Sequence, residues 1–325
     1  MGTHVAHTRV HRGRYEEPAL SSAYCLLEEA RMAFFVALLV HGLLAGALYA
    51  LLALAFVVVY KASRLINFAL GDCAMFAARL AAAGWHGLGL GLVGALGFGC
   101  ASMVALALGV NHLVLRPLVG SPVIALLMVT IGLGTVVRAA AVFLFQGLPA
   151  GLPLPIPREP WVIQGVVLSV DELVAAGIAL LCVAAVSWGW QHSRLGIALR
   201  AMADDQQAAM LVGIDLHRSV ALTWALMGIL CVVAGTLWTV MAGGGVGVVL
   251  VGLKVLPIVI IGGLDSLPGT LLGALVVGLL ESLAAGYLDP LVGGGFSTIA
   301  AYLVALVVLW MRPYGLLGTP DIERV

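Results

Sequence analysis

The stretch that decides the fold is residues 33–60, which read AFFVALLVHGLLAGALYALLALAFVVVY. No Asp, Glu, Lys or Arg interrupts this run, and its few polar atoms belong to His41, Tyr49 and Tyr60. A helix rises about 1.5 Å per residue, so about 20 apolar residues cross the roughly 30 Å hydrocarbon core of a bilayer. Residues 33–60 therefore predict a membrane-spanning helix.

The composition extends this prediction to the whole chain. The 325 residues are 62% hydrophobic and only 10% charged, whereas a soluble domain carries about 25% charged residues. The 16 basic and 16 acidic side chains cancel, which leaves no net charge to attract nucleic acid, and the apolar content excludes a disordered chain. The five cysteines show no metal-binding or redox spacing. The chain is therefore predicted to be a polytopic membrane protein.

The expected fold is an all-α bundle of about eight membrane spans plus one short or broken span near 252–269. Helices satisfy their own backbone hydrogen bonds in lipid, and the apolar segments do not alternate as the strands of a membrane barrel would. Small residues spaced by four, as at Gly42 and Gly46 or Gly269 and Gly273, would let helices approach closely. The expected helical segments are 33–60, 65–84, 87–110, 121–146, 163–190, 218–242, 252–263, 268–287 and 297–311.

The chain divides into a tail, a transmembrane domain and a short end. Residues 1–31 are polar and lack the apolar core of a signal peptide. Because Met32 starts a typical membrane-protein N-terminus, the tail is read either as a start assigned too far upstream or as a genuine surface extension. The transmembrane domain covers 32–318, and 319–325 form a C-terminal tail.

Basic residues in short loops set the orientation. Lys61 and Arg64 share one loop, and Arg116 lies in a second. A third loop has Arg194, Arg200 and Arg218, and Arg312 follows the last span. Placing all four of these basic segments in the cytoplasm gives a consistent topology, in which successive spans cross the membrane in alternating directions.

The segment 252–263 is too short to cross a bilayer comfortably, and Gly262-Gly263-Leu264-Asp265-Ser266 follows its end. Unwound backbone at membrane depth is tolerated only where it is buried in protein or lines a cavity. Gly262, Gly263 and Ser266 are therefore candidates for a translocation pathway. The alternative is a short helix that ends in an ordinary cytoplasmic turn.

Ionisable residues inside the apolar runs are the other pathway candidates. Asp72, Arg138, Lys254 and Glu281 each lie within an expected span, and Asn67 shortly precedes Asp72. A charge at the bilayer centre costs about 2.5–3.5 kcal/mol on insertion scales, so each one needs a reason to be there. The two acids and two bases could pair with each other across the bundle, or they could bind the ammonium and carboxylate of a zwitterionic substrate.

The loop 191–217 is long enough to contain a short helix. Asp204 is placed to cap it, Leu211 lies near its end, and Gly213 suits the position after the last turn. Ala208 and Leu211 would give that helix an apolar edge. Such a helix can dock on a cytosolic partner or lie against its own bundle.

At this loop the sequence resembles the permease subunits of ATP-binding-cassette importers for branched-chain amino acids. The matching loop positions are Gly196, Ala198, Arg200, Ala201, Asp204, Ala208, Leu211, Gly213 and Ile214. Further agreement lies in Ile66-Asn67-Phe68-Ala69 with Gly71-Asp72, in Gly252-Leu253-Lys254 with Gly262-Gly263, Ser266 and Gly269, in Glu281 with Gly286-Tyr287, and in 312–318. The chain departs from the family pattern at Leu70, Ile197 and Asp265, where the family usually has His, a basic residue and Gly.

The resemblance implies a multi-pass permease of the bacterial inner membrane that translocates leucine, isoleucine or valine. It further implies a second homologous permease chain, two ATPases and a periplasmic substrate-binding protein as partners, besides the lipid bilayer. The loop residues implied in ATPase coupling are Gly196, Arg200, Ala201, Asp204, Ala208, Leu211 and Gly213. No Gly-X-X-X-X-Gly-Lys-Ser/Thr phosphate loop occurs, so we expect a transport subunit rather than an enzyme, with no cofactor and with ATP bound by the partner chains.

Three alternatives remain open at this point. The same class of importer could carry urea, a short amide or another amino acid. The chain could instead be a standalone transporter coupled to protons through its intramembrane carboxylates. It could also be a membrane-embedded enzyme that uses Asp72 or Glu281 as a general acid or base.

Overall fold

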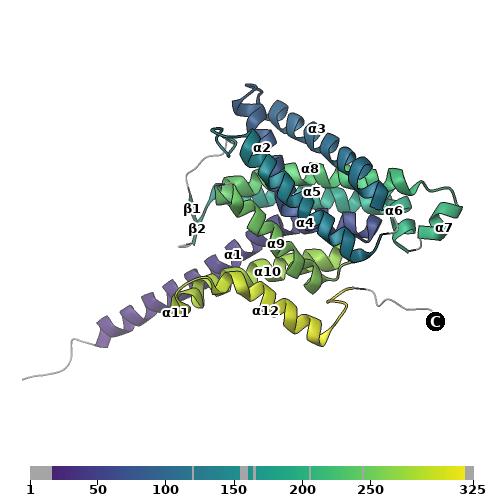
Figure 1. Cartoon of the computed structure of the whole chain (residues 1–325). Coiled ribbons are helices and arrows are strands. Elements are labelled where there is room, and N and C mark those ends of the chain that lie inside the picture. The colour runs from purple at the N-terminus through teal and green to yellow at the C-terminus, as the bar shows by residue number, and fades with distance from the viewer. Residues whose placement is uncertain are drawn as a thin grey trace, which may run out of the picture.

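The computed structural model describes residues 17–118, 121–153, 160–163, 166–204, 206–243 and 245–318, and it is an all-helical bundle with one small hairpin (Figure 1). Within these described ranges, six helices are long and apolar enough to span a membrane, and α9 and α12 are shorter apolar helices. The elements are α1 (Glu17–Ser63), α2 (Leu70–His86), α3 (Leu92–Val110), η1 (Asn111–Leu115), η2 (Arg116–Leu118), α4 (Val123–Leu144), β1 (Trp161–Ile163), β2 (Val166–Leu168), α5 (Val170–His192), α6 (Arg194–Asp204), α7 (Gln206–Leu211), α8 (Leu216–Ala242), α9 (Val246–Gly262), α10 (Leu267–Tyr287), α11 (Asp289–Val292) and α12 (Phe296–Met311).

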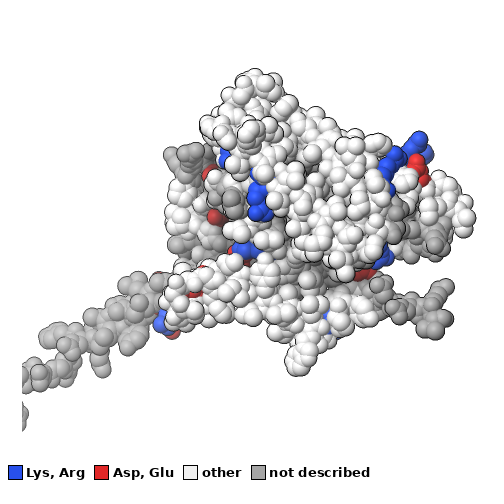
Figure 2. Space-filling view, viewed as in Figure 1, with Lys and Arg blue, Asp and Glu red and all other residues white. Residues whose placement is uncertain are grey.

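The all-α prediction is confirmed, and the chain is a multi-pass membrane protein. Figure 2 shows a largely uncharged surface on which Lys, Arg, Asp and Glu occur singly or in small groups. Exposed side chains on the outer helices are mostly apolar, such as Phe143 on α4, Leu181 on α5 and Leu306 on α12. A surface of this kind suits lipid or protein contact within a membrane.

Helix α1 forms the core of the bundle, and its N-terminal part projects beyond it (Figure 1). Residues 51–55 of α1 are fully buried, and α1 packs against α5, α8, α9 and α10. The closest of these contacts is with α10, where a Cβ on Gly278 would lie 2.4 Å from the carbonyl oxygen of Gly42 and 2.7 Å from the Cα of Gly46. The small-residue pair at 42 and 46 thus does permit close helix packing, with Gly278 as its partner.

Several helix bounds differ from those expected from the sequence. Residues 64–69 are not helical, so α2 begins at Leu70 rather than at 65. The segment expected from 163 onward starts with the antiparallel hairpin of β1 and β2, and α5 begins only at Val170. Asp171 and Glu172 then occupy the first turn of α5, where carboxylates interact favourably with the helix dipole. The short span α9 begins at Val246, six residues earlier than expected.

The basic loops gather at one end of the bundle, which we call the basic end. The guanidinium of Arg64 donates to the carbonyl oxygen of Ala203 at 2.7 Å, and Lys61 lies 5.8 Å from the centre of the Trp190 ring. The backbone N–H of Leu316, close after Arg312, donates to the carbonyl of Ile261 at 2.8 Å. The positive-inside rule assigns the basic end to the cytoplasm.

The opposite end of the bundle is the one that this orientation places outside the cell. His41 Nδ1 lies 2.6 Å from a carboxylate oxygen of Glu172, and Arg79 donates to the carbonyl of Leu148 at 3.0 Å. In the same region Asp289 accepts hydrogen bonds from the backbone and the hydroxyl of Ser297. These bonds from Ser297 lower the pKa of the Asp289 carboxyl below its ordinary value.

Gly278→Ala should destabilise the folded bundle, because the new methyl group meets backbone atoms that no side-chain rotation can move aside. Overpacking of this kind costs about 1–3 kcal/mol. The matched control is Gly97→Ala on α3, where a Cβ has nothing within 4 Å. Thermal unfolding in detergent, followed by the loss of monodisperse protein, measures both variants. Equal melting temperatures for the two would contradict the close contact between α1 and α10.

Candidate functional site

The first intramembrane ion pair joins α2 to α4. Nε of Arg138 donates to Oδ1 of Asp72 at 2.7 Å, and Nη2 donates to Oδ2 at 3.3 Å. The Asp72 side chain is 6% exposed, whereas the Arg138 side chain is 46% exposed. The pair requires a glycine between the helices, because a Cβ on Gly134 would lie 2.5 Å from Oδ2 of Asp72. The sequence left two roles open for these residues: pairing with each other or binding a zwitterionic substrate. The structure shows Asp72 and Arg138 paired.

The non-helical segment 64–69 lies beside the middle of α4, where the sequence had predicted helix. The hydroxyl of Thr130 lies 3.4 Å from both the carbonyl of Ile66 and the backbone nitrogen of Phe68. Thr130 is seven residues from the start of α4, which places this contact about 10 Å along the helix. Unwound backbone at this depth, followed by a helix that starts inside the bundle, is the arrangement found at substrate sites of membrane transporters.

Asn67 holds the turn at the end of this segment. Its Oδ1 accepts from the backbone N–H of Ala69 at 3.0 Å, which explains an asparagine at this position. The side chain is buried, and its Nδ2 has no hydrogen-bond partner. Asn67 therefore carries an unused donor within a few residues of Asp72.

The second intramembrane pair joins α9 to α10 and α1. The ammonium of Lys254 donates to Glu281, and both groups also contact the hydroxyl of Tyr49, which donates to Glu281 at 2.6 Å. The Lys254 side chain is only 13% exposed. Tyr49 stands in the first apolar run, and the analysis of the sequence gave it no role. A tyrosine hydroxyl inside a span is the signal that could have marked it.

A glycine contact places the two ion pairs on neighbouring helices. A Cβ on Gly252 of α9 would lie 2.2 Å from the Cα of Gly71 on α2. Asp72 directly follows Gly71, and Lys254 lies two residues after Gly252. We call the set Arg138, Asp72, Lys254, Glu281 and Tyr49 the polar layer. It crosses the bundle from α4 to α1.

A cavity of about 280 Å³ reaches the polar layer from the opposite end of the bundle. Its lining combines the carboxylates of Glu172 and Glu281 with the hydroxyl-bearing Tyr49 and the apolar Trp238 and Met241. This volume holds several water molecules, whose share in liquid water is about 30 Å³ each. The charged groups deep in the bundle therefore have a polar route toward the outside.

The three remaining pathway candidates lie away from the polar layer, in the turn between α9 and α10. Gly263 has a φ of 107°, and Ser266 caps α10 by accepting from the N–H of Gly269 at 3.1 Å. Gly262 accepts from the N–H of Leu317 in the C-terminal segment. The turn thus packs against residues 312–318 at the basic end. Its glycines serve a close backbone contact there.

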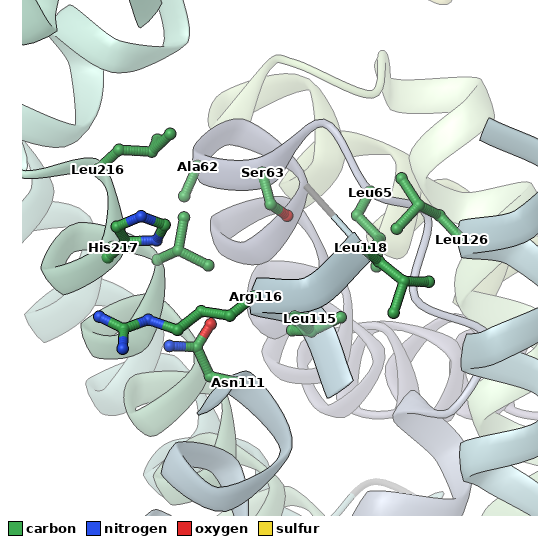
Figure 3. Close-up of a pocket in the computed structure, with 11 residues that line it drawn as sticks. Ala62, Ser63, Leu65, Asn111, Leu115, Arg116, Leu118, Leu126, Leu216 and His217 are labelled. Carbon is green, nitrogen blue, oxygen red and sulfur yellow. The ribbon is translucent and has the colours of Figure 1, made fainter. Parts of the chain in front are cut away.

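A second cavity, of about 180 Å³, lies at the basic end (Figure 3). Ser63 at the end of α1 and Leu65 in the segment after it line this cavity with Asn111 of η1 and Arg116 of η2. His217 of α8 lies beside them. The π-helix η1 was not expected from the sequence. Such turns are rare and often occur at functional sites.

The expected coupling loop contains two helices, α6 and α7, which project from the basic end (Figure 1). Ser193 caps α6 by accepting from the N–H of Gly196 at 2.9 Å, and a Cβ on Gly196 would collide with the carbonyl of Trp190 at 2.2 Å. Arg200 donates to the carbonyl of Gln191 at 2.9 Å. Ala201, on the next position of α6, is half-buried.

Helix α7 ends as the sequence predicts. Gly213 takes a left-handed φ of 91°, and its N–H donates to the carbonyl of Met210. Leu211 is 89% exposed, its neighbour Val212 is also exposed, and so is Ala208 on the same short helix. The expected cap by Asp204 lies outside the described residues, because its side chain is not among them. The exposed apolar end of α7 is the feature that a docking partner would cover.

Among the described residues, no three His, Cys, Asp or Glu side chains gather as a metal site would require.

Comparison with known proteins gives the following similarities. Residues 38–312 match the model of the family described as branched-chain amino acid transport system / permease component. The permease protein BraD of the high-affinity branched-chain amino acid transport system of Pseudomonas aeruginosa is 28% identical over 88% of this chain and 97% of its own length. The corresponding protein LivH of Escherichia coli is 28% identical over 90% of this chain and 98% of its own length. No solved structure matches the chain.

The contact between Lys254 and Glu281 leads to a test of its structural role. Lys254→Met leaves Glu281 without its cation, and because the Glu281 side chain is 24% exposed to the cavity, the loss should stay below the roughly 3–5 kcal/mol that breaking a fully buried pair costs. The double variant Lys254→Met with Glu281→Gln should recover most of this loss, because an amide keeps the hydrogen bond to Tyr49 without a net charge. Melting temperatures of the purified single and double variants measure the recovery. A double variant that is less stable than the single one would show that the two residues do not act as a pair.

Proposed function

The chain belongs to the family of branched-chain amino acid transport permease components, and from this premise we propose that it forms the membrane pathway of an ATP-binding-cassette importer for leucine, isoleucine or valine. The proposal extends to the partners: a second permease chain, two ATPases and an extracytoplasmic substrate-binding protein. The energy for transport then comes from the ATPases, since the sequence contains no phosphate loop.

The structural observation that carries the proposal is the exposed apolar end of α7. Met210, Leu211 and Val212 are all exposed on a helix that projects from the basic end. Apolar side chains clustered at the tip of a projecting helix favour association with a protein surface. When a cytosolic ATPase that is bound to this helix closes, it can move the bundle as a rigid body.

The pairing within the polar layer argues against a standalone proton-coupled transporter. Such a transporter needs carboxylates that gain and lose protons during the cycle. Asp72 is bound by Arg138 and Glu281 by Lys254, so each carboxylate is already engaged in an ion pair within the bundle. Neither carboxylate is therefore free to exchange a proton with an ion pathway or with an enzyme substrate unless its ion pair breaks.

The direct test of function is import into proteoliposomes that contain the permease with its ATPases and the loaded binding protein. We expect ATP-dependent accumulation of radiolabelled leucine, isoleucine or valine. Competition by unlabelled alanine, urea and short amides measures the substrate range. Import of a competitor without import of any branched-chain amino acid would assign the chain another substrate.

The docking role of α7 leads to a prediction at Leu211. Leu211→Asp places a charge in the contact with the ATPase, and loss of one apolar anchor with burial of a charge costs about 2–5 kcal/mol. Because about 1.4 kcal/mol is tenfold in affinity, co-purification of the ATPases should fall by more than tenfold. Leu211→Met, which keeps an apolar side chain of similar volume, is the matched control and should recruit the ATPases normally. Normal recruitment by the Asp variant would exclude Leu211 from the docking contact.

A further inference from the structure

We propose that Arg138 is a substrate-binding residue whose outward guanidinium edge holds the carboxylate of an amino acid during its passage. The inference rests on the proposed function, because it takes an amino acid as the transported molecule.

Arg138 differs from the other base of the polar layer in its exposure. Its side chain is 46% exposed, against 13% for Lys254, which is enclosed between α9, α10 and α1. Asp72 is sealed inside the bundle and can reach no ligand. The pair between α2 and α4 therefore presents a cation outward and hides its anion.

The guanidinium cannot leave the membrane interior by extending toward the surface. Arg138 lies 15 residues after the start of α4 and six before its end, which is about 22 Å and 9 Å along the helix. A free arginine at such a position turns its head group toward the interface. Here two hydrogen bonds to the buried Asp72 hold the guanidinium at the depth of the bundle interior.

Lipid is an unfavourable neighbour for this group, because a guanidinium loses its hydration there. A hydrated pathway removes that cost. Nε and one N–H of Nη2 are occupied by Asp72, so Nη1 and the remaining N–H of Nη2 form the outward edge. Two parallel donors of this kind match the two oxygens of a carboxylate.

The same face of α4 also supplies apolar contacts. Val142 lies one helical turn from Arg138 and Ile131 lies two turns away in the other direction, and both are exposed. A ligand with a carboxylate beside an aliphatic side chain meets both kinds of surface. Leucine, isoleucine and valine have this combination.

Chemical labelling of arginine tests the proposal directly. The assembled importer in lipid nanodiscs is treated with phenylglyoxal, and modification of Arg138 is followed by mass spectrometry with and without millimolar leucine. We expect leucine to slow the modification at least threefold, whereas 3-methylbutylamine, which lacks the carboxylate, has no effect. Arg116, exposed at the basic end, serves as the internal control and should react equally in all samples.

Three outcomes of the labelling would overturn the proposal. Equal rates with and without leucine would show that no carboxylate binds at Arg138. Equal protection by the amine would show that the carboxylate is not what is recognised. No modification in the assembled importer would show that a protein surface, rather than a pathway, covers the guanidinium.

A transport measurement separates this proposal from the proposed function. Asp72→Asn with Arg138→Gln keeps a hydrogen-bonded pair of similar size without charge. We expect leucine imported per ATP hydrolysed to fall at least tenfold, while stimulation of the ATPase by the binding protein stays within twofold. Arg31→Gln should change neither, because Arg31 is exposed and precedes the transmembrane domain. Unchanged coupling in the double variant would refute the role of Arg138, whereas failure of the wild-type importer to move any branched-chain amino acid would refute the proposed function instead.

Discussion

The structure depends on one constraint: a charge inside the hydrocarbon must meet its partner side chain to side chain, and only glycines let the helices come close enough. A Cβ on Gly134 would occupy the place of an Asp72 oxygen, so the pair between α2 and α4 exists because position 134 has no side chain. The contact of Gly71 with Gly252 likewise brings α2 against α9. The high glycine content therefore serves electrostatics as well as packing.

This constraint separates the two ion pairs by function. Lys254 is largely buried and contacts both Glu281 and Tyr49, so its charge is neutralised within the bundle, and these contacts tie α9 to α10 and α1. Arg138 uses only part of its hydrogen-bonding capacity on Asp72 and turns the rest outward. One pair is a structural support, and the other combines support with an accessible cation. The two cations and two anions of the layer give it no net charge, which keeps both pairs compatible with the bilayer interior.

The sequence allows the charged positions to be predicted, because each ionisable residue in an apolar run is costly and needs a reason to be there. It does not allow the partners to be predicted, since that depends on which helices become neighbours. Residues 65–69 were expected to be helical because Leu65, Ile66 and Phe68 continue the apolar pattern of α2. Asn67, whose side chain competes with helical hydrogen bonding, was the local signal of the break. The paired glycines at 262 and 263 were a stronger signal of a helix break in the pathway than Asn67 was. The structure nevertheless places this turn at the basic end, away from the polar layer.

The non-helical segment also connects the docking helices to the polar layer. Arg64 begins it with a φ of 52°, a left-handed conformation that is uncommon for a residue with a side chain. Its guanidinium holds the carbonyl of Ala203 in the last turn of α6, and eight residues later the chain reaches Asp72. Helical backbone would resist a local change in direction, whereas the residues between Arg64 and Ala69, which lie outside the helices, can change their dihedral angles at lower cost. If an ATPase docks as proposed, a displacement of α6 would reach the Asp72–Arg138 pair through this short segment of covalent chain. The connection from α6 to Asp72 thus consists of one hydrogen bond, from Arg64 to Ala203, and eight peptide units of chain.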